Sequence, residues 1–251
     1  MAQPPAPMPA VHGAPPAVPP RPDGPPAWPL ADWGLDELLP MLLVPFGIVL
    51  LAQELVVGFF GWTSDGARVL LSLVQQLALL LPLVVWVRRT RGSLAPLGLR
   101  RGWTGRDVAA GVGGGLVAIV AGVIVIGLTL SVVEGLTGHR PDVTSGLRSV
   151  AGPWVFAEAL LAVVFAPLCE ETFFRGFLFG GLRRRWRLVP AALVSGAFFG
   201  FAHVEPIRFV GLATMGAILA VIFERRRTLT ASIAAHATIN VLAVLALLLA
   251  R

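Results

Sequence analysis

Three pairs of residues spaced four apart lie within long apolar stretches of the sequence. They are Glu171 with Arg175, Phe199 with His203, and His236 with Asn240. Because a helix has 3.6 residues per turn, the members of each pair lie on one face of their helix. Ionisable groups at membrane depth cost free energy, so we treat these residues as candidates for function.

The two adjacent glutamates are expected to have different roles. Glu171 precedes Arg175 by four residues, the order that favours an ion pair along a helix. Glu170 is rotated by about 100° from Glu171 and lacks that cation. We therefore expect Glu171 and Arg175 to support the site and Glu170 to act as a general base.

The histidines and the asparagine provide groups that a single carboxylate lacks for hydrolysis. In this interpretation Glu170 removes a proton from water, and His203 shares that task. His236 or Asn240 donates hydrogen bonds to the developing oxyanion. Glu170, His203 and His236 would alternatively hold a zinc ion whose bound water attacks. The sequence lacks the HExxH spacing that would strongly indicate zinc, so zinc stays an alternative.

Structural explanations compete with this hypothesis. Polar residues in membrane bundles often join helices by hydrogen bonding, which would explain any one of the pairs. Three pairs on three separate helices favour a functional site instead. Glu54 and Glu158 are isolated acids, for which we expect protonated or helix-paired structural roles. Cys169, the only cysteine, is expected to be a small packing residue.

The composition is that of a membrane protein. Of the 251 residues, 56% are hydrophobic and only 14% are charged, with a mean hydropathy of +0.79. A soluble domain would carry roughly a quarter charged residues. The net charge is +6, but the arginines form short clusters between apolar blocks, as in cytoplasmic loops. A nucleic-acid-binding face needs a contiguous basic stripe, so no nucleic-acid partner is expected.

The apolar blocks predict an all-α protein, a polytopic bundle of about seven transmembrane helices in a lipid bilayer. The predicted spans are residues 38–60, 68–87, 108–133, 153–181, 188–204, 207–224 and 229–250. The fourth is longer than the roughly 20 residues that cross a bilayer. Pro167 removes a backbone hydrogen bond within it, which predicts a kink just before the two glutamates.

The arginines predict how the bundle is oriented. Most lie in the second, fourth and sixth loops, namely Arg88, Arg89, Arg91, Arg100, Arg101, Arg106, Arg183, Arg184, Arg185, Arg187, Arg225, Arg226 and Arg227. These loops share one side, expected to be the cytoplasm of a bacterial cell, with the N-terminus inside and the C-terminus outside. Twelve of the 21 prolines fall within residues 1–30. Residues 1–36 are therefore predicted to be a disordered cytoplasmic tail, and residues 37–251 the transmembrane domain.

The motifs EExxxR, FxxxH and HxxxN, in this order, resemble those of the CPBP family of intramembrane endopeptidases (CAAX prenyl protease and bacteriocin-processing, or Abi). The resemblance covers about residues 150–250 and implies a CAAX-protease-like core. It implies catalysis through a glutamate without a catalytic metal, in a family formerly classed as metalloproteases. It assigns catalysis to Glu170, His203, His236 and Asn240, and support of the site to Glu171, Arg175 and Phe199.

The leading hypothesis is an intramembrane endopeptidase that cleaves a membrane-bound or prenylated-like protein or peptide with water activated by Glu and His. Eukaryotic members of the family remove three residues from prenylated CAAX proteins, whereas bacterial relatives are linked to peptide processing, export and self-immunity. The motifs alone do not choose among these substrates. The alternative is a non-enzymatic membrane protein that acts in bacteriocin immunity, partner binding or proton-coupled transport. Transport would be favoured by an internal repeat, and none is evident.

Overall fold

The computed structural model describes residues 31–99, 103–141 and 151–249, and within these residues every regular element is a helix. The all-α class is therefore confirmed. In chain order the elements are α1 (Leu35–Gln53), η1 (Glu54–Phe59), α2 (Asp65–Arg91), η2 (Ala95–Leu97), α3 (Gly105–Thr137), α4 (Trp154–Leu160), η4 (Leu161–Phe165), α5 (Ala166–Glu171), η5 (Thr172–Phe179), α6 (Gly180–Arg183), α7 (Leu188–Ala202), α8 (Phe209–Arg226) and α9 (Leu229–Leu249).

The long helical stretches follow the predicted spans closely. α1 continues into η1, and α4 through α6 form one run over residues 154–183. With α2, α3, α7, α8 and α9, these are the seven long stretches of the described chain. By length and composition, four are able to cross a membrane: Leu35–Phe59, Asp65–Arg91, Gly105–Thr137 and Leu229–Leu249.

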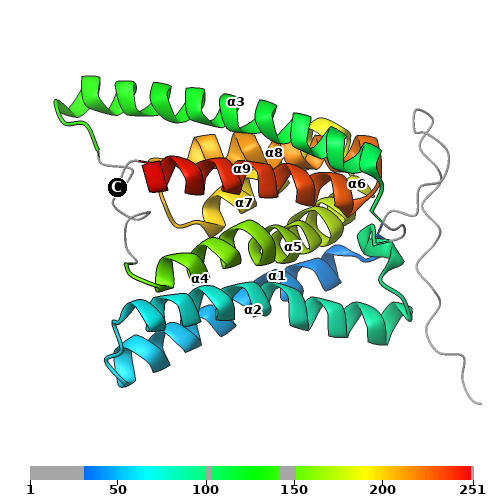
Figure 1. Cartoon of the computed structure of the whole chain (residues 1–251). Coiled ribbons are helices and arrows are strands. Elements are labelled where there is room, and N and C mark those ends of the chain that lie inside the picture. The colour runs from blue at the N-terminus through cyan, green and yellow to red at the C-terminus, as the bar shows by residue number, and fades with distance from the viewer. Residues whose placement is uncertain (1–30, 100–102, 142–150, 250–251) are drawn as a thin grey trace, which may run out of the picture.

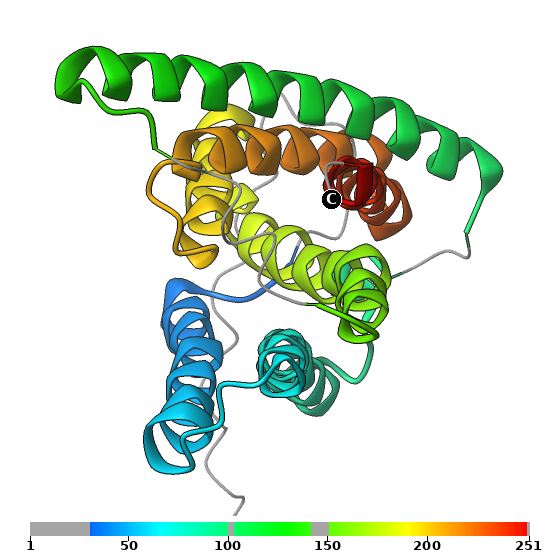
Figure 2. The same ribbon diagram turned by 60° about the vertical axis from the view of Figure 1, so that its left-hand side comes forward.

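The run over residues 154–183 lies between two groups of helices (Figures 1 and 2). On one side of it, α1 and α2 pack against each other. On the other side lie α7, α8 and α9, and α3 packs outermost against α8 and α9. Because α5 contacts both α2 and α9, the glutamates of the first motif are placed at the centre of the bundle.

Small residues bring the helices around the motifs close together. A Cβ added at Gly115 of α3 would lie 2.5 Å from Ala235 O of α9. One added at Gly196 of α7 would lie 2.4 Å from Ala213 O of α8. Close backbone approach of this kind drives helix association in membranes, where the hydrophobic effect between helices is absent. It fixes α9, and with it His236, against the rest of the bundle.

The outer surface is apolar where it would face lipid. Large hydrophobic side chains are exposed along α1 and α3, among them Leu39, Leu43, Leu50, Val117, Val120, Ile124 and Leu128. Contiguous apolar exposure on this scale marks contact with a membrane or a partner. Phe59, Phe60 and Trp62 are exposed near the end of this first helical stretch, where aromatic rings favour the membrane–water interface.

Residues on the N-terminal side of residue 37, where the transmembrane domain is predicted to start, also pack into the bundle. α1 begins at Leu35, and both Ala31 and Trp33 are buried. The Trp33 Nε1–H donates to Phe177 O at 3.1 Å, and the indole packs edge-on against Trp86. Burial suits an indole because the large apolar ring packs while its single N–H finds an acceptor. Residues 1–30 of the predicted tail lie outside the described residues.

The arginine-rich loops meet at one end of the bundle. Ion pairs there are Arg91 with Glu37 at 2.8 Å, Arg183 with Glu224 at 2.6 Å, and Arg226 with Asp107 at 2.6 Å. They join the start of α1 to the end of α2, and the end of α8 to the end of α6 and the start of α3. Arg184, just after α6, donates to Asp32 O, just before α1, and so connects the two groups. These ends therefore share a side, as the placement of the even-numbered loops predicted. Arg100 and Arg101 of the second loop lie outside the described residues.

Candidate active site

Five polar side chains from separate parts of the chain form one buried cluster. Gln76 comes from α2, Glu170 and Glu171 from the end of α5, Arg175 from η5, and His236 from α9. All five are buried, and Glu171 and Arg175 are fully enclosed. Polar groups are tolerated at such depth when they partner one another. We call these five residues the polar cluster.

The backbone that carries the two glutamates is irregular on both sides. α5 is a short α-helical segment between two π-helical ones, η4 before it and η5 after it. π-Helical segments inside α-helices occur frequently at functional sites, because they rotate the following side chains relative to the preceding ones. Pro167, near the start of α5, has no N–H to donate to the preceding turn. The backbone just before the glutamates is therefore irregular, and the predicted kink itself stays a prediction.

The predicted ion pair between Glu171 and Arg175 is present. Arg175 Nη1 lies 2.9 Å from Glu171 Oε1, with both side chains fully buried. Arg175 Nη2 donates to Gly216 O of α8 at 3.2 Å, and the guanidinium lies 4.5 Å from the centroid of the Phe199 ring of α7. Arg175 thus joins η5 to α7 and α8 while it balances the charge of Glu171, as expected of a supporting residue.

His236 lies between the two glutamates. Its Nδ1 is 2.9 Å from Glu171 Oε1, and its Nε2 is 3.9 Å from Glu170 Oε2. When Nδ1 carries the proton it donates to Glu171, and Nε2 then faces Glu170. Glu171 therefore orients the imidazole as well as pairing with Arg175. This second partner of Glu171 was not predicted.

Glu170 has weaker partners than Glu171. Its Oε1 accepts a hydrogen bond from Gln76 Nε2 at 3.1 Å. Its Oε2 is buried and has no hydrogen-bond donor among the described residues. No arginine pairs with Glu170 in the described part of the chain, so its carboxylate is not engaged in an ion pair with a permanent cation. A positioned carboxylate with one oxygen available is the environment that a general base requires.

His203 lies outside the polar cluster. It follows the last residue of α7 and is exposed, and its Nδ1 lies 2.8 Å from Phe199 O of the same helix. Its share in activating water stays a prediction, and among the described residues it makes no hydrogen bond to Glu170. The physical reason is that α7 ends at Ala202, which leaves His203 at the helix terminus. His203 and His236 both contact the Phe199 ring, with centroid separations of 4.8 and 5.5 Å.

Asn240 is bonded to a backbone carbonyl. Its Nδ2 donates to Ala162 O in η4 at 2.6 Å. The Ala166 N–H bonds to Leu161 O, and the next residue, Pro167, has no N–H. Asn240 therefore provides a donor that the irregular backbone needs. An amide has two N–H hydrogens, so the second is left for the oxyanion role, which stays a prediction.

Glu170, His203 and His236, the ligands in the zinc alternative, are not grouped as a metal site in the described part of the chain. No group of three or more His, Cys, Asp or Glu side chains in the described ranges lies close enough to bind a metal ion. His203 is separate from the polar cluster, and His236 Nδ1 is already bonded to Glu171. The residues present therefore do not fit the two-histidine, one-carboxylate set.

The remaining polar residues of the helices have structural surroundings. Ser72 Oγ of α2 donates to Glu158 Oε1 of α4 at 3.0 Å, so Glu158 is paired between helices. Glu54 is exposed in η1. Cys169 is a buried free thiol that packs within α5. None of the three belongs to the polar cluster.

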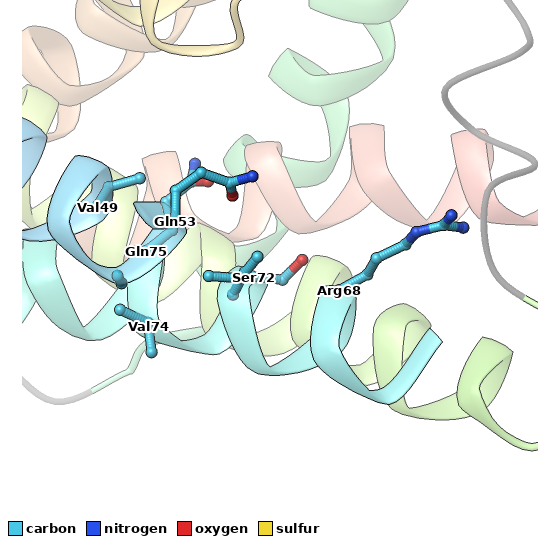
Figure 3. Close-up of a pocket in the computed structure, with 8 residues that line it drawn as sticks. Val49, Gln53, Arg68, Ser72, Val74 and Gln75 are labelled. Carbon is cyan, nitrogen blue, oxygen red and sulfur yellow. The ribbon is translucent and has the colours of Figure 1, made fainter. Parts of the chain in front are cut away.

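Gln76 is the member of the polar cluster that sequence reasoning missed. Its only signal is that Gln75 and Gln76 interrupt an apolar span. The two side chains have different surroundings, since Gln75 lines a pocket of about 280 Å³ between α1 and α2. Figure 3 shows Gln75 on α2 and Gln53 on α1 among the residues lining that pocket. No residue of the polar cluster lines it, so the pocket is a separate feature.

Comparisons with known proteins agree with the motifs. Residues 152–242 match the family model for type II CAAX prenyl endopeptidase Rce1-like proteins, and this range includes all three motifs. "Putative membrane peptidase YdiL" of Bacillus subtilis (strain 168) is 27% identical over 86 residues, 34% of this chain and 35% of that protein. This chain thus covers about a third of that relative. No solved structure matches the chain significantly. The resemblance is confirmed over residues 152–242 of this integral membrane protein, which match CAAX prenyl endopeptidases.

Proposed function

We propose that the protein is an intramembrane endopeptidase that hydrolyses a peptide bond of a membrane-bound protein or peptide. The observation that carries this proposal is the environment of Glu170. It is a buried carboxylate with one oxygen held by Gln76 and the other 3.9 Å from His236 Nε2. It lies in a region that matches a family of CAAX prenyl endopeptidases.

In the proposed reaction Glu170 removes a proton from a water molecule, and the water oxygen attacks the carbonyl carbon of the scissile bond. Charge that develops on the carbonyl oxygen is stabilised by His236 when its Nε2 is protonated. The C–N bond then breaks, and the proton held by Glu170 passes to the leaving nitrogen. Glu171 balances the charge on His236 throughout, because it is bonded to Nδ1.

We propose that His203 and Asn240 take part in the same reaction from the border of the polar cluster. His203 is exposed and meets the polar cluster only at the Phe199 ring, so a bound substrate or a water molecule has to connect it to Glu170. Asn240 holds the backbone of η4 and directs its second amide hydrogen to the reaction. We further propose that the arginine-rich end faces the cytoplasm of a bacterial cell, with the N-terminus inside and the C-terminus outside.

The proposal is tested by comparing the chain ends of membrane and exported peptides in cells that contain either the native protein or Glu170→Ala. A terminus that vanishes in the variant identifies both substrate and cleavage site. His203→Ala is expected to abolish the same terminus. The matched control is Glu54→Ala, an exposed acid outside the polar cluster, which is expected to leave that terminus in place. All variants are first shown to accumulate equally in the membrane.

A non-enzymatic membrane protein makes the opposite prediction. If no terminus depends on Glu170 while the variant is inserted and folded, hydrolysis by this site is excluded. A resistance phenotype toward a bacteriocin that survives Glu170→Ala would then indicate binding rather than cleavage.

A further inference from the structure

We infer that Gln76, which lies outside all three motifs, is a positioning residue for Glu170 and helps to orient the attacking water. This inference rests on the proposed role of Glu170 as the base. Gln76 belongs to α2, and 94 positions separate it from Glu170. It also lies outside residues 152–242, the range that matches the peptidase family.

Gln76 is in direct contact with Glu170. Gln76 Nε2 donates to Glu170 Oε1 at 3.1 Å, and both side chains are more than nine-tenths buried, with exposures of 7% and 6%. A donor held at this depth fixes the carboxylate in one rotamer. Because the amide is neutral, it orients the carboxylate without an ion pair, in contrast to Arg175 beside Glu171.

The side chains of Gln76 and Glu170 each have an oxygen that can still accept a hydrogen bond. Gln76 Oε1 and Glu170 Oε2 are both buried, and neither has a hydrogen-bond donor among the described residues. They belong to two groups that are already joined by a hydrogen bond. A water molecule has two hydrogens, so one water can donate to both oxygens and keep a lone pair for attack. Only the carboxylate is basic enough to take a proton, so the transfer goes to Glu170.

The arrangement at Gln76 and Glu170 differs from the structural tie between the same two helical stretches. The tie between Ser72 and Glu158 already provides a link from α2 to the same helical run, at 3.0 Å. Glu158 Oε2 and Glu171 Oε2 are unpaired too, but among the described residues only Gln76 and Glu170 are joined by a hydrogen bond while each keeps a buried oxygen without a donor. An oxygen of this kind carries a free-energy cost. A water molecule that donates a hydrogen bond to the Gln76 oxygen during the reaction offsets that cost.

The test uses a synthetic peptide that spans the terminus identified with Glu170→Ala. Gln76→Leu removes the donor and the acceptor with little change in volume. We expect kcat to fall about 100-fold, the loss typical of a misplaced reacting group, while KM stays unchanged. Gln75→Leu is the matched control, because it makes the same change one position earlier on α2, away from the polar cluster. It is expected to keep the native kcat.

The pH dependence of cleavage by Gln76→Glu is a second measurement. It should match that of the native protein if Gln76 has only a structural role. The new side chain can donate to Glu170 only while it holds a proton. Cleavage is therefore expected to survive at acid pH and to fail as the pH rises, with a loss that the native pH profile lacks. This variant also decides the question if Gln76→Leu fails to accumulate in the membrane.

The outcomes separate the two proposals. If Glu170→Ala abolishes cleavage while folded Gln76→Leu keeps the native kcat and Gln76→Glu keeps the native pH profile, this inference is overturned and the proposed function stands. If cleavage does not depend on Glu170, the proposed function is overturned and this inference falls with it. A low kcat in Gln76→Leu, native KM, and native kcat in Gln75→Leu support the inference.

Discussion

The two sides of α5 differ sharply although their glutamates are adjacent in sequence. On the side of Glu171, facing α8 and α9, the partners are charged or able to carry charge: Arg175 and His236, each at 2.9 Å. On the side of Glu170, facing α2, the hydrogen-bonding partner is the neutral amide of Gln76. The motifs therefore provide the charged side of the polar cluster, and α2, which lies outside the matched region, provides the neutral side.

The two sides of α5 are also expected to differ in how substitution affects the free energy of unfolding and the rate of cleavage. A buried ion pair is stable only while both partners are present, since either charge alone is left in a low-dielectric interior. Loss of Arg175, the permanent cation on the side of Glu171, is therefore expected to cause loss of folding. The side of Glu170 lacks such a pair and is expected to respond with loss of rate. The predictions below test that division.

The largest effect is expected from Arg175→Met. It leaves Glu171 buried without its cation, at a cost of about 3–5 kcal/mol. We expect the variant to unfold at lower temperature in membranes and to accumulate poorly, as measured by thermal unfolding and by protein yield. The control is the double variant Glu171→Leu with Arg175→Met, which removes both charges and should recover much of the stability. Equal instability of the single and double variants would contradict the prediction.

The next effect is on rate. His236→Ala removes the imidazole next to Glu170 Oε2, and we expect kcat to fall about 10²–10³-fold, as for loss of an oxyanion donor. The measurement is cleavage of the peptide identified in the test above. His139→Ala, which changes an exposed histidine just beyond the end of α3, is the matched control and should keep the native rate. A rate above one tenth of the native value in folded His236→Ala would refute the role.

A smaller effect is expected from Asn240→Leu. It leaves Ala162 O without the donor that η4 needs, at a cost of about 1–3 kcal/mol if that carbonyl is not resolvated. Thr238→Val on the same helix is the control, because Thr238 Oγ donates only within its own helix, to Ala234 O. Thermal unfolding measures the difference. If the folded Asn240 variant also loses kcat, its second amide hydrogen acts in the reaction.

The smallest effect is expected from chelation. Since the polar cluster does not provide a three-ligand set, treatment with 1,10-phenanthroline or EDTA is expected to leave the rate of cleavage unchanged. The control is a zinc peptidase treated in parallel. If chelation abolishes cleavage and added Zn²⁺ restores it, a metal ion takes part in the reaction. The description of the two sides of α5 would then have to include that metal ion.

Local features of this molecule were predictable from sequence, and contacts between distant segments were not. The helical stretches follow from apolar blocks, and the ion pair between Glu171 and Arg175 follows from a spacing of four within one helix. The pairing of Gln76 with Glu170 depends instead on which helix faces meet across 94 positions. The separation of His203 from Glu170 depends on where α7 ends, a detail that apolar periodicity does not contain.

The contact between Trp33 and Phe177 has a consequence for the order in which this protein is made. The indole N–H and its acceptor are 144 positions apart, so most of the chain must leave the ribosome before the contact forms. Until then the start of α1 lacks that anchor, although α1 and α2 already have each other as neighbours. Closing so long a loop carries an entropic cost that the completed core has to offset. The start of α1 is therefore held first by α2, and its attachment to η5 follows only after Phe177 has been made.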